Sequence, residues 1–241
     1  MARTAINLYS VRELDEPMLE TLDRVAAAGY DGVQFSGGFG DATPAEVADH
    51  LDTIGLEATG CHVDFDDIEA DPAGVAETYA AIGSHGLVVP WLSDDHFESR
   101  EAALATAERL DELAAALDPH GATLHYHNHA HEFVDVDGDV AFEVFADASS
   151  VFIEPDVGWI RTGGADPAAL IRRYGDRIDL VHMKDMTADG EFCEIGDGVV
   201  DMHACADAAR EVDASWLIYE HDEPDDPVAS IDRGAEFLAG L

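Results

Sequence analysis

The hydrophobic and polar positions of the chain repeat in one unit. An alanine-rich stretch with apolar residues three and four apart is followed by a glycine or polar turn and then by a short β-branched run. The clearest copy is EPMLETLDRVAAAGYDGVQF, in which Pro17 suits the first turn of a helix and Gly29 suits its end. The pattern predicts a helix followed by a strand, repeated along the chain.

Eight such strands can be read from the sequence: TAINLYSV, GVQF, LEATGCHV, GLVVPWL, ATLHYHN, SVFIEPDVGW, IDLVHMKD and SWLIYEH. They begin roughly every 30 residues, which is the spacing of strand–helix units with short loops. This organisation predicts one domain over residues 1–241, a (β/α)₈ TIM barrel. A doubly wound open sheet is the rival fold, but it usually has a glycine-rich turn after the first strand, where this chain has SVRELDEP.

The charge of the chain indicates its solvent and its partners rather than its fold. There are 52 acidic and 12 basic residues, spread along the chain, and Lys184 is the single lysine. This predicts a halophilic protein, because molar salt screens self-repulsion. It argues against a nucleic-acid partner, which needs a basic surface.

The chain contains no run of about 18 apolar residues, so no membrane span is predicted. An N-terminus that leads directly into a strand predicts a cytoplasmic location.

Candidate chemistry lies at the ends of the last four predicted strands. In a barrel of this type the active site forms at the C-terminal ends of the strands. Those ends offer Glu132, Asp156, His182 and Glu220. Taken singly, Asp156 could be a turn carboxylate, His182 a buried core histidine and Glu220 part of an acidic surface. Together, on adjacent strands, they predict a site for one divalent ion, with Mn²⁺, Mg²⁺, Co²⁺ and Zn²⁺ all open.

The stretch LHYHNHAHEF places a histidine at every second position: His125, His127, His129 and His131. On a strand all four side chains would lie on one face, but they would span about 20 Å, too far for one ion. At most one or two of them can be metal ligands.

Three other residues are candidates for contact with a substrate. Lys184 lies beside His182 at a strand end, where its ammonium group would hold a substrate oxygen or donate a proton, unless it is an ordinary surface lysine. His62 is the notable polar residue of the first four strand ends. Trp159 would line an apolar wall against a sugar ring, or simply pack.

The segments YHNHAHEF, DVGWIRTGGADPAALIRRYGDRIDLVHMKD, IGDGVVDM and YEHDEP resemble the sugar phosphate isomerase/epimerase superfamily, the xylose isomerase-like barrels that include inosose dehydratases and ketose 3-epimerases. The resemblance covers Tyr126 to Glu223. It implies a divalent ion held from four strands, with Asp156, His182 and Glu220 as three ligands. For the fourth ligand we favour Glu132 over His127 or His125.

The resemblance also implies an activity, the metal-dependent isomerisation or epimerisation of a sugar or sugar derivative. Glu220 or Glu132 would remove a proton beside the carbonyl and the other would return it, while Lys184 and His62 hold substrate oxygens. His127 and His129 would lie near substrate and metal.

Two alternatives are an inosose dehydratase-like lyase and a non-catalytic sugar-binding barrel. A DNA endonuclease is disfavoured by the negative charge. The substrate would be a small sugar, and a homo-oligomer remains open.

Overall fold

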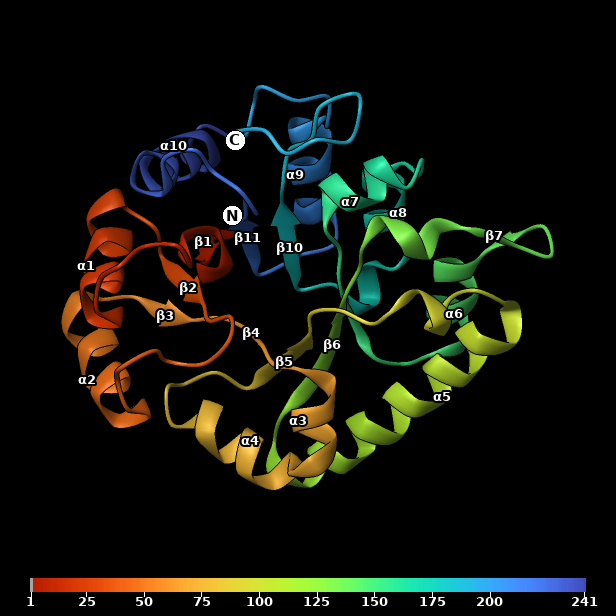
Figure 1. Ribbon diagram of the computed structural model, residues 1–241, viewed down its shortest axis with the longest axis horizontal. Coiled ribbons are helices and arrows are strands. Elements are labelled where there is room, and N and C mark those ends of the chain that lie inside the picture. Colours follow the sequence, from red (N-terminus) through yellow and green to blue (C-terminus); the bar gives the residue numbers. More distant parts are fainter. Residues whose placement is uncertain (1) are drawn as a thin grey trace.

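The strands form a closed ring with helices on its outside, as Figure 1 shows. The computed structural model describes residues 2–241. One parallel sheet runs in the order β10 (Leu180–Met183), β11 (Trp216–Tyr219), β1 (Arg3–Asn7), β2 (Gly32–Gln34) and β3 (Glu57–Ala58). The other runs in the order β4 (Cys61–His62), β5 (Gly86–Val89), β6 (Thr123–His127) and β9 (Phe152–Glu154). Parallel bridges from Ser36 to His62 and from Asp156 to His182 join the two sheets.

This arrangement confirms the predicted (β/α)₈ barrel, with one difference in the third strand. The predicted strand LEATGCHV is divided into β3 and β4, which belong to different sheets. Gly60 lies at the division, where a Cβ atom would come within 2.6 Å of Leu180 Cδ1. The absence of a side chain at this position therefore lets Leu180 reach across the barrel interior.

The helices follow the strands in the predicted alternation. The predicted helix after Pro17 is α1 (Met18–Ala28), which ends at Gly29 with a φ of 96°. Thr43 and Glu46 form a capping box at the start of the next helix, α2 (Pro44–Ile54). The remaining helices are α3 (Phe65–Ala70), α4 (Pro72–Ala80), α5 (Arg100–Leu117), α6 (Ala141–Ala148), α7 (Val157–Thr162), α8 (Pro167–Arg173), α9 (Met202–Glu211) and α10 (Pro227–Ala239).

A small hairpin was not predicted. It joins β7 (Asp135–Val136) to β8 (Asp139–Val140) and projects from the barrel in Figure 1. Its turn is Asp137–Gly138, and both residues have positive φ values, 59° and 90°. An Asp-Gly pair flanked by alternating hydrophobic residues, here Val134, Val136 and Val140, is a strong hairpin signal.

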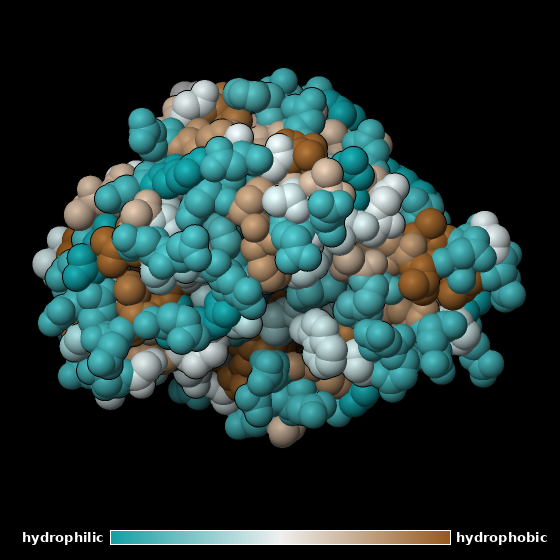
Figure 2. All heavy atoms as spheres, turned by 45° about the horizontal axis from the view of Figure 1, so that its top comes forward, coloured by the Kyte–Doolittle hydropathy of each residue, from teal (hydrophilic) through white to brown (hydrophobic). Residues whose placement is uncertain are grey.

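Apolar side chains fill two separate regions. The main core lies between the strands and the surrounding helices, and a second cluster consists of Ala5, Val88, Leu180, Trp216 and Ile218. These five alternate along their strands with residues of the main core, so they face the barrel interior. The face shown in Figure 2 is largely hydrophilic, with scattered apolar side chains. Among residues 2–241, no helix has the length and apolar character needed to cross a membrane.

Candidate metal centre and its pocket

A pocket of about 720 Å³ opens at the C-terminal ends of the strands. Its wall includes His62, His127, His129, Lys184 and Glu220, all of which the sequence predicted as site residues. The same wall also includes Tyr9, Arg12, Asp64, Tyr79, Trp91 and Asp222, which sequence reasoning missed. The pocket therefore lies where a barrel of this type forms its active site.

Four buried side chains at one side of this pocket could hold a metal ion: His127, Asp156, His182 and Glu220. Their ligand atoms all lie within 4.8 Å of one another. His182 Nδ1 is 2.8 Å from Glu220 Oε2, and His127 Nε2 is 3.5 Å from Asp156 Oδ2. The carboxylates and imidazoles come from four adjacent strands, β6, β9, β10 and β11 or the residues that follow them.

The hydrogen bonding of this group fits a cation. Within residues 2–241, Asp156 Oδ2 and both ring nitrogens of His127 are buried without a hydrogen-bond partner. Buried polar atoms normally have partners, and His127 Nε2 faces Asp156 Oδ2 at 3.5 Å and Glu220 Oε2 at 3.7 Å, so this nitrogen and the two carboxylates fit a shared cation. Two carboxylate oxygens and two imidazole nitrogens are a donor set that divalent ions accept.

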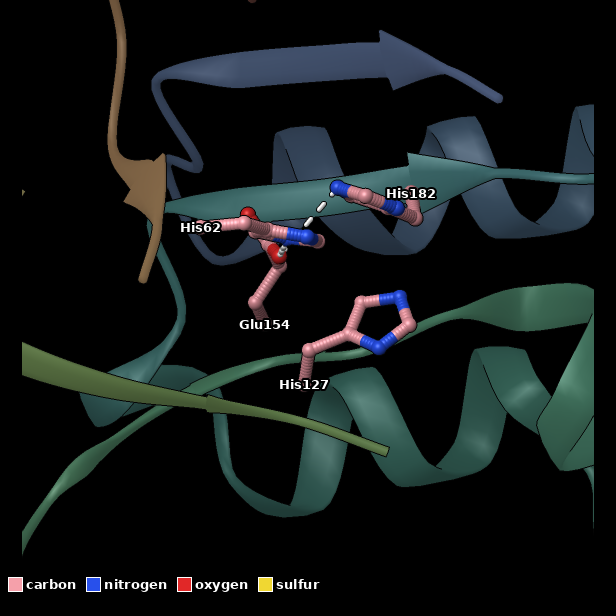
Figure 3. A group of neighbouring side chains, drawn as sticks. All are labelled: His62, His127, Glu154 and His182. Atoms are coloured by element: carbon pink, nitrogen blue, oxygen red, sulfur yellow. Dashed lines mark hydrogen bonds and ion pairs between the residues drawn. The ribbon is translucent and has the colours of Figure 1, made fainter. Parts of the chain in front are cut away.

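The sequence did not predict a role for Glu154, a fully buried residue of β9. Figure 3 shows its carboxylate between His62 and His182, with His127 facing the same group. Glu154 Oε2 is 2.7 Å from His62 Nε2 and 3.2 Å from His182 Nε2. Gln34 Nε2 donates to Glu154 Oε1 at 2.6 Å. Glu154 precedes Asp156 by two residues, so the period of a strand places both on the interior face.

The partners of His182 determine which of its nitrogens carries a proton. Its Nε2 lies 2.6 Å from Gln34 Oε1 and next to the Glu154 carboxylate. Both neighbours are acceptors, so Nε2 must be the donor. Nδ1 faces another acceptor, Glu220 Oε2, at 2.8 Å, so without an ion both nitrogens donate, and an ion bound at Nδ1 would replace the proton there. Glu154 and Gln34 thus orient the His182 ring. In other metalloproteins a carboxylate or carbonyl oxygen orients a metal-binding histidine in the same way.

Lys184 lies against the same group and is only 2% exposed. Its Nζ is 3.2 Å from Asp156 Oδ2, 2.9 Å from Glu220 Oε2 and 2.7 Å from Asp222 Oδ1. Although burial disfavours the ammonium ion, these three carboxylates raise the pKa of Lys184. The single lysine of the chain is therefore a buried, charged residue in an acidic cluster.

The two histidines of the metal group also carry charge in the absence of an ion. Burial lowers the pKa of His182, but Glu154 and Glu220 outweigh it and raise the value to about 10. In His127, burial is likewise outweighed by Asp156 and Glu220, and the pKa rises to about 9. Protons or a cation must therefore balance these carboxylates.

The structure does not bring Glu132 into the metal group. Its side chain is buried outside the pocket wall, and its Oε1 accepts hydrogen bonds from Tyr126 Oη at 2.7 Å and from His129 N at 2.9 Å. Burial raises the pKa of Glu132 to about 8. His127, the alternative fourth ligand, takes the place that we expected for Glu132.

The remaining predicted residues are distributed as follows. His129 lines the pocket, while Trp159 does not: it packs beneath Lys184, with its ring centre 5.0 Å from Nζ. His125 lies deeper, with its Nε2 2.9 Å from Asp179 Oδ1, and His131 Nε2 donates to the backbone oxygen of Leu92 at 3.0 Å. His62 reaches the pocket, but both of its nitrogens already have partners, Glu154 and Asn7.

The fold and this cluster define a class of protein, a (β/α)₈ barrel with a candidate site for a divalent ion at the C-terminal ends of its strands. Residues 22–241 match the family model described as xylose isomerase-like TIM barrel. The chain belongs to this family.

Proteins similar to the chain carry the names of isomerases, epimerases and dehydratases. It is 30% identical to an inosose dehydratase of Geobacillus kaustophilus over 43% of its own length and 40% of the relative. It is 24% identical to the rhizopine catabolism protein MocC of Rhizobium meliloti over 94% of its length and 82% of that protein. The chain thus spans about two fifths of the first relative.

Solved structures support the same fold. A sugar phosphate isomerase/epimerase from Parabacteroides distasonis superposes with a TM-score of 0.84 at 22% identity, covering 99% of this chain and 94% of that one. The IolI protein with a zinc atom superposes with a TM-score of 0.77 at 16% identity, covering 99% and 97%. At these identities both structures show the shared fold.

Proposed function

We propose that this protein is a divalent-metal-dependent enzyme that removes a proton from the carbon beside a carbonyl group of a sugar or sugar derivative, yielding an isomer or epimer. One observation carries the proposal: His127, Asp156, His182 and Glu220 converge beside a pocket of about 720 Å³. A divalent ion bound by these residues would polarise the carbonyl and acidify the neighbouring C–H bond. The mixed nitrogen and oxygen ligands favour Zn²⁺, Co²⁺ or Mn²⁺ over Mg²⁺.

Proton transfer is assigned to Glu220 and Asp222, since both carboxylates line the pocket. They lie two residues apart after β11 and share the ammonium group of Lys184. One carboxylate takes the proton from carbon and the other returns it to the enediol. Asp222 replaces Glu132 in this role, because Glu132 is not part of the pocket wall.

Lys184 supports both carboxylates. Its buried ammonium group compensates their negative charge and fixes their positions relative to each other. Because three carboxylates already hold its ammonium group, the role of Lys184 is to neutralise their charge and not to donate a hydrogen bond to a distant group of the substrate.

A second candidate function is the dehydration of a keto-inositol, supported by the similarity to inosose dehydratases. It begins with the same proton removal, but a hydroxyl group on the next carbon then leaves as water. The two functions differ in their products rather than in their first step.

Proton exchange with solvent tests both functions. The metal-loaded protein is incubated in D₂O with free ketoses and a keto-inositol, and NMR follows the C–H group beside the carbonyl. We expect deuterium to enter that position. Isomeric sugars as products would support the first candidate, and the loss of one water from the keto-inositol would support the second.

Variants at the two carboxylates complete the test. Glu220→Gln and Asp222→Asn should reduce exchange by at least about 100-fold, in the range of a lost acid–base group. Asp225→Asn serves as the control, because Asp225 is exposed and outside the pocket wall. Sugar binding without exchange in the wild type would indicate a non-catalytic barrel and contradict the proposal.

A further inference from the structure

The segment that carries Asp222 is irregular. It joins β11 to α10. Within residues 2–241, no backbone–backbone hydrogen bond outside the helices and strands involves residues 221–225. Backbone N–H and C=O groups need other partners where regular structure does not supply them. The position of Asp222, to which we assign proton transfer, therefore depends on hydrogen bonds to side chains.

The end of the neighbouring strand, β1, supplies two of these side chains. β1 and β11 are parallel and pair with Ile6 beside Tyr219. Because parallel strands of a barrel end at the same face, the residues that follow them lie next to each other. After β1 the chain forms the short helix Leu8–Val11. This helix lies beside the segment that carries Asp222.

Two hydrogen bonds join the chain after β1 to that segment. Ser10 Oγ, buried in the short helix, accepts one from the backbone N–H of His221 at 3.0 Å. Arg12, directly after the helix, donates the other from Nη1 to the backbone oxygen of Asp222. Lys184 holds the side chain of the same residue, with Nζ 2.7 Å from Oδ1. The backbone and the carboxylate of Asp222 are thus held from two different strands.

The guanidinium group of Arg12 is oriented by its own turn. Nη1 also donates to the backbone oxygen of Tyr9 at 2.9 Å, and Cζ lies 3.9 Å from the centre of the Tyr9 ring. The second contact has the geometry of a cation–π interaction. Nη1 therefore bridges backbone oxygens that follow β1 and β11.

We infer that Arg12 is a positioning residue for Asp222. It holds the backbone of the segment after β11 where the Asp222 carboxylate can transfer a proton, and Ser10 supplies the second hydrogen bond. This inference rests on the proposed function and adds a residue that acts through Asp222 rather than on the substrate. A displacement of about 1 Å in a reacting group can lower a rate by about 100-fold, so the loss of this contact should lower turnover.

The variant Arg12→Gln tests the inference in the metal-loaded full chain. NMR in D₂O follows exchange of D-fructose, D-ribulose and a keto-inositol. We expect kcat for exchange to fall by about tenfold or more while KM changes by less than about twofold, as for a group that contributes only in the transition state. Because Arg12 lines the pocket, it could instead contact the substrate. A higher KM with unchanged kcat would show such a contact and overturn the inference, as would two unchanged constants.

Arg3→Gln is the matched control. Arg3 begins β1, pairs with Glu57 and lies 3.9 Å from the centre of the Trp216 ring, so it makes similar contacts at the other end of the strand. It does not line the pocket. Both kinetic constants should stay unchanged. Equal losses in Arg12→Gln and Arg3→Gln would assign the effect to the fold and overturn the inference.

A double variant tests whether Arg12 acts through Asp222. The effects of two residues that act independently on a rate multiply. In an Asp222→Asn background the carboxylate is already gone, so adding Arg12→Gln should lower kcat by less than about twofold further. A further loss as large as in the wild-type background would contradict the inference.

The zinc content of Arg12→Gln separates an effect on Asp222 from an effect on the whole site. The hydrogen bonds and the ion pair of Arg12 within residues 2–241 involve none of the four candidate metal ligands. Bound Zn²⁺ per folded chain should therefore equal that of the wild type, and a loss of zinc would overturn the assignment to Asp222. No exchange of any of the three compounds by the wild type would overturn the proposed function and this inference with it.

Discussion

The two ends of the barrel interior differ sharply in chemistry although the same strands build both. At the N-terminal end, Leu180 and Ile218 belong to an apolar cluster. Two residues further along the same strands are His182 and Glu220, which belong to the candidate metal group. Two residues of strand advance by about 7 Å. The interior face of one strand thus changes from apolar core to candidate metal site between two successive inward-facing residues.

The energetic roles of the two ends differ as well. Burial of apolar area at the N-terminal end stabilises the fold by about 25 cal/mol for each Å². At the C-terminal end, buried charges such as Glu154 and Lys184 need partners to offset their loss of water. We therefore assign stability mainly to the apolar end and metal binding to the polar end.

The largest expected effect on stability comes from the apolar end. Leu180→Ala should lower the free energy of unfolding by about 2–5 kcal/mol, because it removes a buried side chain that packs against Gly60. The affinity of the folded protein for metal should stay unchanged. Denaturant unfolding and metal titration of the same variant check both points, and a variant that keeps its stability but loses metal would break the comparison.

A change at Glu154 should act mainly on the polar end. Glu154→Gln would place an amide N–H group beside His182 Nε2 and favour the tautomer with a proton on Nδ1. We expect metal affinity to fall by about 10- to 100-fold, as for other residues that orient metal ligands. Calorimetric titration with Zn²⁺ measures this effect, with Glu143→Gln as the control carboxylate outside the pocket. Equal affinity in both variants would contradict the assigned role.

The smallest effect on the site is expected from Glu132→Gln. The pKa of Glu132 is raised by burial from an ordinary value of 4.5 to about 8. The folded protein therefore binds this proton more tightly than the unfolded chain, so its contribution to stability is full below about pH 4.5 and is lost as the pH rises to about 8. Relative to Glu132→Gln, the wild type should lose stability across that window. Parallel unfolding curves at pH 5 and pH 8 would contradict this.

Sequence patterns predicted the fold well because strand and helix periods are local. The barrel, the helix from Met18 to Ala28 and the placement of Asp156, His182 and Glu220 at strand ends followed from alternation and spacing. The division of the third strand depends on Gly60 and Leu180 meeting across the barrel, a contact that spacing does not reveal.

The site was predicted less completely. Glu132 follows the histidine strand closely in sequence, but the backbone turns into the short helix Ala130–Phe133, where the side chain bonds to Tyr126 and His129 N instead. Glu154 and Asp222 each lie two residues from a predicted ligand. The alternation applied to the histidines would have placed both on the interior face. Gln34 gave no comparable signal, because its role depends on the distant residues His182 and Glu154.

The metal content of three proteins tests the central claim most directly. Wild type, His127→Ala and Glu132→Gln are equilibrated with Zn²⁺ and analysed for bound metal per folded chain. The account predicts about one ion in the wild type and in Glu132→Gln, as expected for a four-ligand site, and a strong loss in His127→Ala. Metal retained by His127→Ala but lost from Glu132→Gln would contradict it.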